Sequence, residues 1–105
     1  REHFLGLYVD VRYRPIGFRI IATGTADQAL IHPREVFQAA VLLGAAAVLL
    51  GHIHPSGDPT PSTEDREVTD RLRRAGEILG IKVLDSIVFE ESGRWARVEA
   101  LVGRP

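Results

Sequence analysis

The stretch PSGDPTP at positions 55–61 constrains the fold most, because it holds three prolines and a glycine in seven positions. Each proline fixes its own φ angle and lacks a backbone N–H, so this stretch cannot form a helix or a central strand. We expect a stiff loop here, which separates an apolar segment before it from a long amphipathic segment after it.

The apolar segment before the loop, AAAVLLG at 45–51, predicts a short central strand that runs directly into His52-Ile53-His54. The segment after the loop, from Ser62 to Leu79, is the clearest helix in the chain. Ser62 is a good N-cap, acidic residues follow in the first turn, and Gly80 ends the segment. Its apolar residues recur at helical spacing along one face: Val68, Leu72, Ala75 and Leu79.

The rest of the chain supplies five further elements. Two aromatic and aliphatic runs, at 3–11 and 16–23, predict a pair of antiparallel strands, the first of them central and buried on both faces. Pro33 opens a helix that Gly44 ends, and the runs at 81–89 and 94–102 predict a closing pair of strands. The order β-β-α-β-α-β-β therefore predicts a single α/β domain over residues 1–105, with a mixed, mostly antiparallel β-sheet and helices covering its faces.

Composition argues against several kinds of function. With 13 basic and 14 acidic residues among 105, the formal net charge is −1, which does not support a large nucleic-acid interface. The densest cationic cluster, Arg71, Arg73 and Arg74, lies among acidic residues and is better explained as a solvated helix face. The absence of cysteine excludes disulfides, a thiolate nucleophile and cysteine-bound zinc, so a metal would need His, Asp or Glu ligands.

No apolar run in the sequence approaches the roughly 20 residues that span a bilayer, and the N-terminus lacks the layout of a signal peptide. We therefore expect a soluble, cytoplasmic protein with no membrane partner. The composition leaves the oligomeric state open, a homo-oligomer included.

His52 and His54 lie two positions apart on the predicted strand, so their side chains point to the same face and could bind one ion. They stand at the end of an apolar strand, where α/β folds place ligands. In the following helix, Asp65 shares the inward face with Val68 and Leu72. A buried lone carboxylate is costly unless it is paired or bound to a metal, so His52, His54 and Asp65 together predict a metal site.

Each of these residues also has a simpler explanation. Ser62 followed by Asp65 three positions later is close to a capping box, which satisfies backbone N–H groups at the start of a helix. A single histidine at a strand end is more often exposed or hydrogen-bonded within the fold than bound to a metal. Capping and metal binding are compatible, so both interpretations stay open.

The spacing H-x-H-x7-S-x2-D, formed here by His52, His54, Ser62 and Asp65, resembles the signature of the JAMM metalloproteases, also called JAB or MPN+ proteins. The longer string HIHPSGDPTPSTED, with HPREVF before it and LGIKVLDSIVF after it, resembles the bacterial RadC branch of that family. The resemblance covers nearly the whole chain. It implies a JAB/MPN fold of the cytidine-deaminase-like kind.

The same resemblance implies a role for five residues. His52, His54 and Asp65 would be ligands of one zinc ion per chain. Glu2 would be the general base, and Ser62 would donate a hydrogen bond to the developing oxyanion.

Two positions depart from the usual RadC pattern, and neither is an inferred ligand. Ile53 replaces the Asn of the string HNHPSG, and Ser86 replaces the His of the string LDHI. The helix-hairpin-helix region that usually precedes the domain in RadC proteins is absent from this sequence.

Two functional hypotheses follow. The first is a zinc-dependent hydrolase that cleaves a peptide, isopeptide or related amide bond in a peptide or protein substrate, because three protein ligands leave zinc a fourth position for water. The second is a non-catalytic JAB-fold module for binding or scaffolding, linked to DNA repair only by the RadC name. The sequence does not identify the substrate.

Overall fold

The turn after the first strand closes a hairpin through one aspartate. In the computed structural model, which describes residues 3–23, 31–54 and 58–98, strand β1 spans His3–Val9 and strand β2 spans Pro15–Thr23. Between them, the Asp10 carboxylate accepts hydrogen bonds from the backbone N–H groups of Arg12 and Arg14, at 2.8 and 3.0 Å. The expected antiparallel pair of strands is confirmed.

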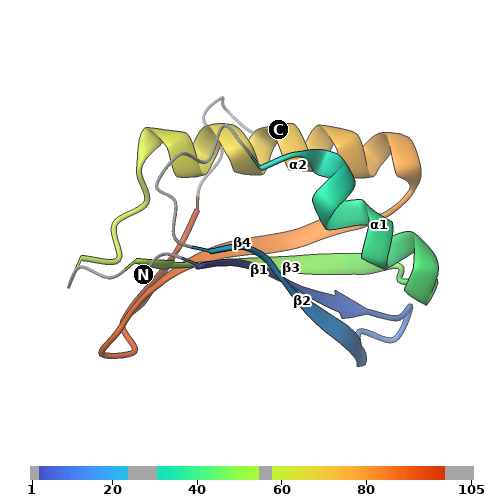
Figure 1. Cartoon of the computed structure of the whole chain (residues 1–105), viewed down its shortest axis with the longest axis horizontal. Coiled ribbons are helices and arrows are strands. Elements are labelled where there is room, and N and C mark those ends of the chain that lie inside the picture. Colours follow the sequence, from blue (N-terminus) through green and yellow to red (C-terminus); the bar gives the residue numbers. More distant parts are fainter. Residues whose placement is uncertain (1–2, 24–30, 55–57, 99–105) are drawn as a thin grey trace.

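The remaining elements follow in the predicted order. Helix α1 spans Pro33–Leu43, strand β3 Ala47–His54, helix α2 Thr63–Leu79, strand β4 Lys82–Glu90 and strand β5 Trp95–Arg97. The strands form one sheet in the order β2-β1-β3-β4-β5, in which only β3 and β4 are parallel neighbours. The expected α/β fold with a mixed, mostly antiparallel sheet is confirmed (Figure 1).

Both helices begin and end where the sequence indicates. The backbone at Gly44 and Gly80 is left-handed, with φ angles of 67° and 74°, a conformation that favours glycine because it has no Cβ. Pro33 is the first residue of α1, and the His32 side chain caps this helix by accepting a hydrogen bond from the Arg34 backbone N–H. Local signals therefore set the lengths of both helices.

Both helices lie on the same face of the sheet (Figure 1), whereas the sequence led us to expect helices over both faces. Helix α1 connects β2 to β3, and α2 connects β3 to β4. Each connection joins parallel strands and moves the same way across the sheet. Because such connections are right-handed in nearly all proteins, two that move in one direction place their helices on one face.

The core forms between these helices and the sheet face that they cover. Tyr8 is fully buried there, and its hydroxyl donates a hydrogen bond to the backbone carbonyl of Val36 at 2.6 Å, which satisfies its polar atom. The other large core side chains come from β1, α1, β3 and α2: Phe4, Phe37, Leu50, Val68 and Leu72. The predicted inward face of α2 is confirmed at Val68 and Leu72.

The opposite face of the sheet is also apolar, but no described helix covers it. Leu5 and Leu7 of β1 point to this face and are half-buried. Phe18 and Ile20, their partners in β2, are 62% and 52% exposed. Strand β1 is central, as expected, but it is not buried on both faces, because both helices lie on the other side of the sheet.

Two predicted segments extend beyond the described residues. Strand β5 covers three residues, Trp95–Arg97, of the run predicted at 94–102, and residues 99–102 lie outside the described part of the chain. Of the predicted loop at 55–61, residues 58–61 form neither helix nor strand, and residues 55–57 are not described. Neither α1 nor α2 is long and apolar enough to cross a membrane.

Candidate metal centre

The end of β3 carries two histidines that point to the helix-covered face of the sheet. In the register, His52 lies opposite Phe4 of β1 and Val88 of β4, and its side chain is buried. The ring of His54 meets the ring of His52 edge-on, with 4.6 Å between the two centroids. The predicted common orientation of the two imidazoles is confirmed.

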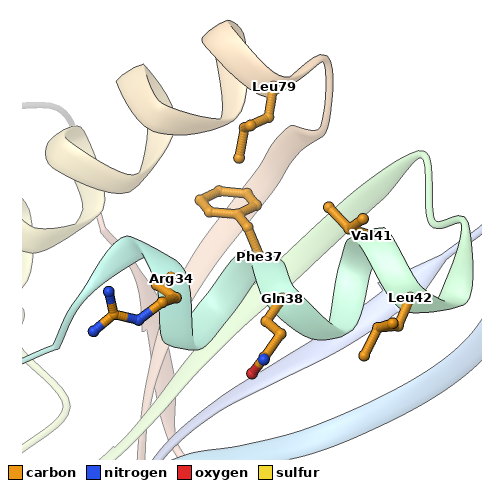
Figure 2. Close-up of a pocket in the computed structure, with 6 residues that line it drawn as sticks. All are labelled: Arg34, Phe37, Gln38, Val41, Leu42 and Leu79. Atoms are coloured by element: carbon orange, nitrogen blue, oxygen red, sulfur yellow. The ribbon is translucent and has the colours of Figure 1, made fainter.

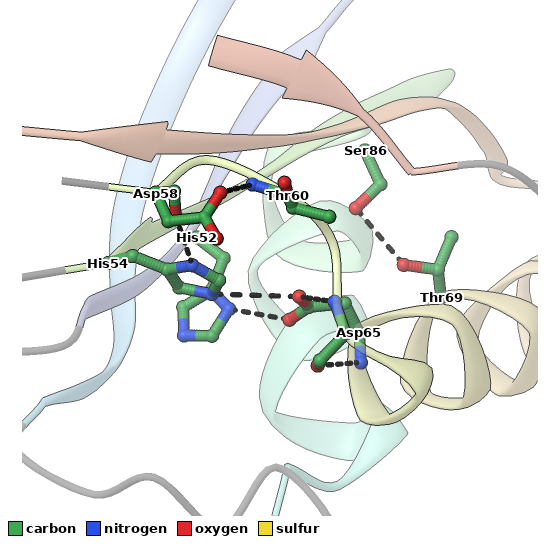
Figure 3. Close-up of polar contacts among 8 residues, drawn as sticks. His52, His54, Asp58, Thr60, Asp65, Thr69 and Ser86 are labelled. Carbon is green, nitrogen blue, oxygen red and sulfur yellow. Dashed lines mark hydrogen bonds and ion pairs between the residues drawn. The ribbon is translucent and has the colours of Figure 1, made fainter. Parts of the chain in front are cut away.

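The first turn of α2 brings the Asp65 carboxylate to the histidines. Asp65 Oδ1 lies 2.8 Å from Nδ1 of His52, and Asp65 Oδ2 lies 3.5 Å from Nε2 of His54 (Figure 3). The Asp65 side chain is only 2% exposed. A carboxylate buried to this extent needs polar partners, and the two imidazoles are among those it has.

Among the described residues, His52, His54 and Asp65 form a group that could hold a metal ion. One ligand atom from each lies within 4.8 Å of the others. In a tetrahedral zinc site with bonds of about 2.1 Å, two ligand atoms lie about 3.4 Å apart, so the three donors would move closer together around a bound ion. Two imidazoles and a carboxylate are also donors that zinc accepts. The residues therefore bring together, at one place in the fold, donors of the kind that zinc binds.

Ser62 is the N-cap of α2. Its hydroxyl oxygen accepts a hydrogen bond from the Asp65 backbone N–H at 3.0 Å, and the Asp65 carboxylate accepts one from the Ser62 backbone N–H at 2.6 Å. These reciprocal bonds form a capping box, so the capping interpretation is confirmed. Because Asp65 also contacts both histidines, one carboxylate both caps the helix and belongs to the candidate metal group of His52, His54 and Asp65.

Glu2 lies outside the described residues, so its expected role stays a prediction. The strand that follows it in the chain is described. His3 pairs with Ile53, and Phe4 pairs with His52, so β1 begins beside the strand that carries the two histidines.

Two contacts beside the histidines were not expected from the sequence. The second ring nitrogen of His54, Nδ1, lies 3.4 Å from the backbone carbonyl of Asp58. Next to His54 in the register, Glu90 of β4 is buried, and a hydrogen bond from the Ser92 hydroxyl, with another from the Arg94 backbone, lowers the pKa of its carboxyl. In both cases an acidic residue stands two positions before a hydroxyl residue, a turn signal that the sequence contains. The turns lie beside the histidines only because the fold brings these segments together, so their position could not be read from the sequence.

A shallow apolar groove lies between α1 and the C-terminal end of α2 (Figure 2). Its volume is about 390 Å³, and six residues of α1 and α2 line it: Arg34, Phe37, Gln38, Val41, Leu42 and Leu79. Leu79 and Asp65 stand near opposite ends of α2, about 20 Å apart along the helix axis. The groove is therefore separate from the group of His52, His54 and Asp65.

Comparison with known proteins agrees with this geometry. Residues 1–99 match the family described as the RadC-like JAB domain. The chain belongs to this family. The resemblance drawn from the spacing of the histidines, Ser62 and Asp65 is thereby confirmed at the level of the family.

Curated relatives of this RadC-like JAB domain carry the name UPF0758 protein. The chain is 52% identical over 89 residues to one from Geotalea uraniireducens, 45% over 93 residues to one from Thermotoga maritima, and 50% over 99 residues to one from Pelobacter propionicus. These matches cover 85, 89 and 94% of this chain, but only 39, 42 and 43% of the relatives. The chain thus spans about two fifths of the length of the curated relatives that it matches.

Ile53 and Ser86, where the sequence departs from the RadC pattern, are not part of the candidate metal group in this RadC-like JAB domain. Ile53 alternates with the two histidines along β3, so it points to the uncovered face of the sheet. Ser86 is buried in β4, and its hydroxyl oxygen accepts a hydrogen bond from the Thr69 hydroxyl at 3.1 Å. Thr69 follows Asp65 by one turn of α2 (Figure 3). The hydrogen bond between Thr69 and Ser86 therefore links α2 to β4 close to Asp65.

Proposed function

We propose that this domain binds one zinc ion through His52, His54 and Asp65 and hydrolyses a peptide, isopeptide or related amide bond. The observation that carries the proposal is the buried Asp65 carboxylate, which contacts both imidazoles where β3 ends and α2 begins. Membership of the RadC-like JAB domain family supports the same conclusion. The expected partner is a peptide or protein substrate.

The number and type of donors favour a catalytic metal over a structural one. Structural zinc sites use four protein ligands, whereas catalytic sites use three and keep one position open. The described residues supply three donors within reach of one another. A zinc ion bound there would supply a Lewis acid and lower the pKa of a water molecule to about 7.

Two residues of the chain would act directly on the reacting atoms. The Ser62 hydroxyl accepts a hydrogen bond from the Asp65 backbone N–H through its oxygen, so its own proton is free to be donated to a substrate oxygen as negative charge develops there. Glu2 would take a proton from the attacking water and pass it to the leaving amine, as the resemblance to the JAMM proteins implies.

Metal analysis of the purified, untagged protein tests the ligand assignment. We expect about one zinc ion per chain in the parent protein. The His54→Ala protein should lose the zinc, because it lacks one of the three donors. The His32→Ala protein is the control and should keep the zinc, since the His32 side chain caps α1 and is not part of the group. Full zinc occupancy in the His54→Ala protein would show that the assignment is wrong.

Cleavage of a peptide and isopeptide library tests the chemistry. The Glu2→Gln protein should keep its fold and its zinc but lose the cleavage that the parent performs, because the amide is nearly isosteric and cannot accept the proton. Cleavage at the parent rate by this variant would exclude Glu2 as the base. A parent protein that holds zinc but cleaves nothing in the library would instead favour the scaffold hypothesis.

A further inference from the structure

His54 has a contact at each ring nitrogen, and together these contacts determine which nitrogen carries a hydrogen. Nδ1 lies 3.4 Å from the backbone carbonyl oxygen of Asp58, and Nε2 lies 3.5 Å from Oδ2 of Asp65 (Figure 3). A carbonyl oxygen only accepts hydrogen bonds, so Nδ1 is the donor and carries the hydrogen of the neutral ring. The lone pair of neutral His54 is therefore on Nε2, which faces the Asp65 carboxylate. A cation between these two atoms would be stabilised by both.

The turn that offers this carbonyl is shaped by the side chain of Asp58. Asp58 Oδ1 accepts a hydrogen bond from the Thr60 backbone N–H at 2.9 Å, which forms an Asx turn. Pro59 and Pro61 restrict the backbone on either side of Thr60. The carboxylate thus stabilises the turn, while the carbonyl of the same residue meets His54.

From these contacts we propose that Asp58 is a positioning residue for His54. Its side chain holds the turn, its backbone carbonyl accepts the Nδ1–H of His54, and Nε2 is thereby presented to a metal ion shared with Asp65 and His52. The inference rests on the metal site proposed above and adds the residue that orients one of its ligands. Hydrogen-bond partners of metal-bound histidines fix the tautomer and the ring orientation, and losing them typically weakens metal binding by about 10- to 100-fold.

Three variants distinguish the effect of the Asp58 turn on zinc affinity from the effects of the Asp58 charge and of overall stability. Asp58→Ala removes the turn and the charge, whereas Asp58→Asn removes the charge but keeps an oxygen that can accept from the Thr60 N–H. Asp10→Ala is the matched control, because Asp10 closes the β1–β2 turn with the same kind of hydrogen bonds. That turn adjoins Ala47, at the opposite end of β3 from His52, a separation of about 17 Å along the strand.

Zinc affinity is measured for each protein by competition with a chromophoric chelator at neutral pH. We expect Asp58→Ala to bind zinc about 10- to 100-fold more weakly than the parent, and Asp58→Asn and Asp10→Ala to bind it like the parent. Parent-like affinity in Asp58→Ala would overturn the proposal. Equal weakening in Asp58→Asn would assign the effect to charge, and equal weakening in Asp10→Ala would assign it to stability, so either result also contradicts the proposal.

The tautomer of His54 in the metal-free protein gives a second measurement that a purely structural role would not change. Nitrogen-15 NMR of the imidazoles should show the hydrogen on Nδ1 of His54 in the parent and a shift toward Nε2 in Asp58→Ala. A parent protein with the hydrogen on Nε2 would overturn the proposal even if zinc binds. If the parent binds no zinc, the metal site itself is wrong, and the tautomer then tests only the contact between His54 and Asp58.

Discussion

The two carboxylate oxygens of Asp65 have different partners. This explains why the sequence was compatible both with a helix cap and with a metal ligand at this residue. Oδ2 accepts the Ser62 backbone N–H and completes the capping box, while Oδ1 contacts His52. Helical spacing was enough to place Asp65 on the inward face of α2, and strand alternation was enough to place both histidines on one side of β3. The contact between them could not be predicted from spacing alone, because it depends on how α2 packs against the sheet.

The turn at Asp58 shows what residue patterns leave out. The string Asp58-Pro59-Thr60 contains a turn signal, and it lies within the stretch where a stiff loop was expected. Nothing in the string indicates that its carbonyl meets a histidine, since that contact joins the loop to the end of a strand. Glu2 is the reverse case, because its role is inferred only from the resemblance and its position is not described.

Ser62 is the residue at which stability and catalysis can be separated. Loss of the N-cap hydroxyl in Ser62→Ala should cost about 1 kcal/mol of unfolding free energy, whereas Ser62→Gly should cost only a few tenths, because glycine is an acceptable N-cap. If the hydroxyl also donates to the oxyanion, both variants should lower turnover by about a hundredfold or more. Chemical denaturation and turnover of a substrate found in the library measure the two effects. Parent-like turnover in Ser62→Gly would refute the catalytic role.

At the scale of elements, the order and the type of every strand and helix followed from the sequence, while their arrangement around the sheet did not. Prolines, glycines and apolar spacing mark the segments, and the structure confirms the order β-β-α-β-α-β-β. We expected helices on both faces because the first strand is apolar throughout. The handedness of the two connections overrides that expectation, since both place their helix on one face.

Gly76 marks the closest approach between α2 and the chain that leaves it. A Cβ at this position would overlap the backbone carbonyl oxygen of Ile81 and lie 3.3 Å from Cζ of Phe37 in α1. Alanine normally stabilises a helix by about 1 kcal/mol relative to glycine, but overpacking against backbone costs about 1–3 kcal/mol. We therefore expect Gly76→Ala to lower the unfolding free energy.

The control for Gly76 is Glu77→Ala, which changes the next, exposed residue of the same helix. It should alter the unfolding free energy by no more than about 0.5 kcal/mol. Chemical denaturation of both variants measures the difference. A Gly76→Ala protein as stable as the parent would mean that α2 and the segment after it are not packed as closely as the structure indicates.

At the scale of the whole molecule, the candidate metal group of His52, His54 and Asp65 lies where the covered face of the sheet, the end of β3 and the start of α2 meet. The helices cover one face of the sheet, and His52 and Asp65 are buried between them and the sheet. The other face of β1 and β2 is partly exposed to solvent. The fold class, the order of the elements and the residues of this candidate group could be predicted from the sequence. The unequal burial of the two sheet faces could not be predicted from residue type, because both faces are apolar.

Two phenylalanines on neighbouring strands allow the burial of the two sheet faces to be compared. Phe4 of β1 points into the core and is 3% exposed, whereas Phe18 of β2 points to the uncovered face and is 62% exposed. Phe4→Ala should cost about 3–5 kcal/mol of unfolding free energy, because it removes a ring from a packed core and leaves a cavity. Phe18→Ala should cost less than about 1 kcal/mol, since most of its ring already contacts water.

Chemical denaturation of the two variants provides the comparison, and Phe4→Leu with Phe18→Leu repeats it if Phe4→Ala is too unstable to purify. The leucine pair should keep the same order with smaller differences, because leucine fills part of the space that alanine leaves empty. Equal costs at the two positions would contradict the structure, since they would require a further layer of protein over Phe18. The ring of Phe4 also lies 5.9 Å from the ring of His52, so it helps to hold that imidazole in place. If His52 is a zinc ligand, the Phe4→Leu protein should therefore bind zinc more weakly than the Phe18→Leu protein.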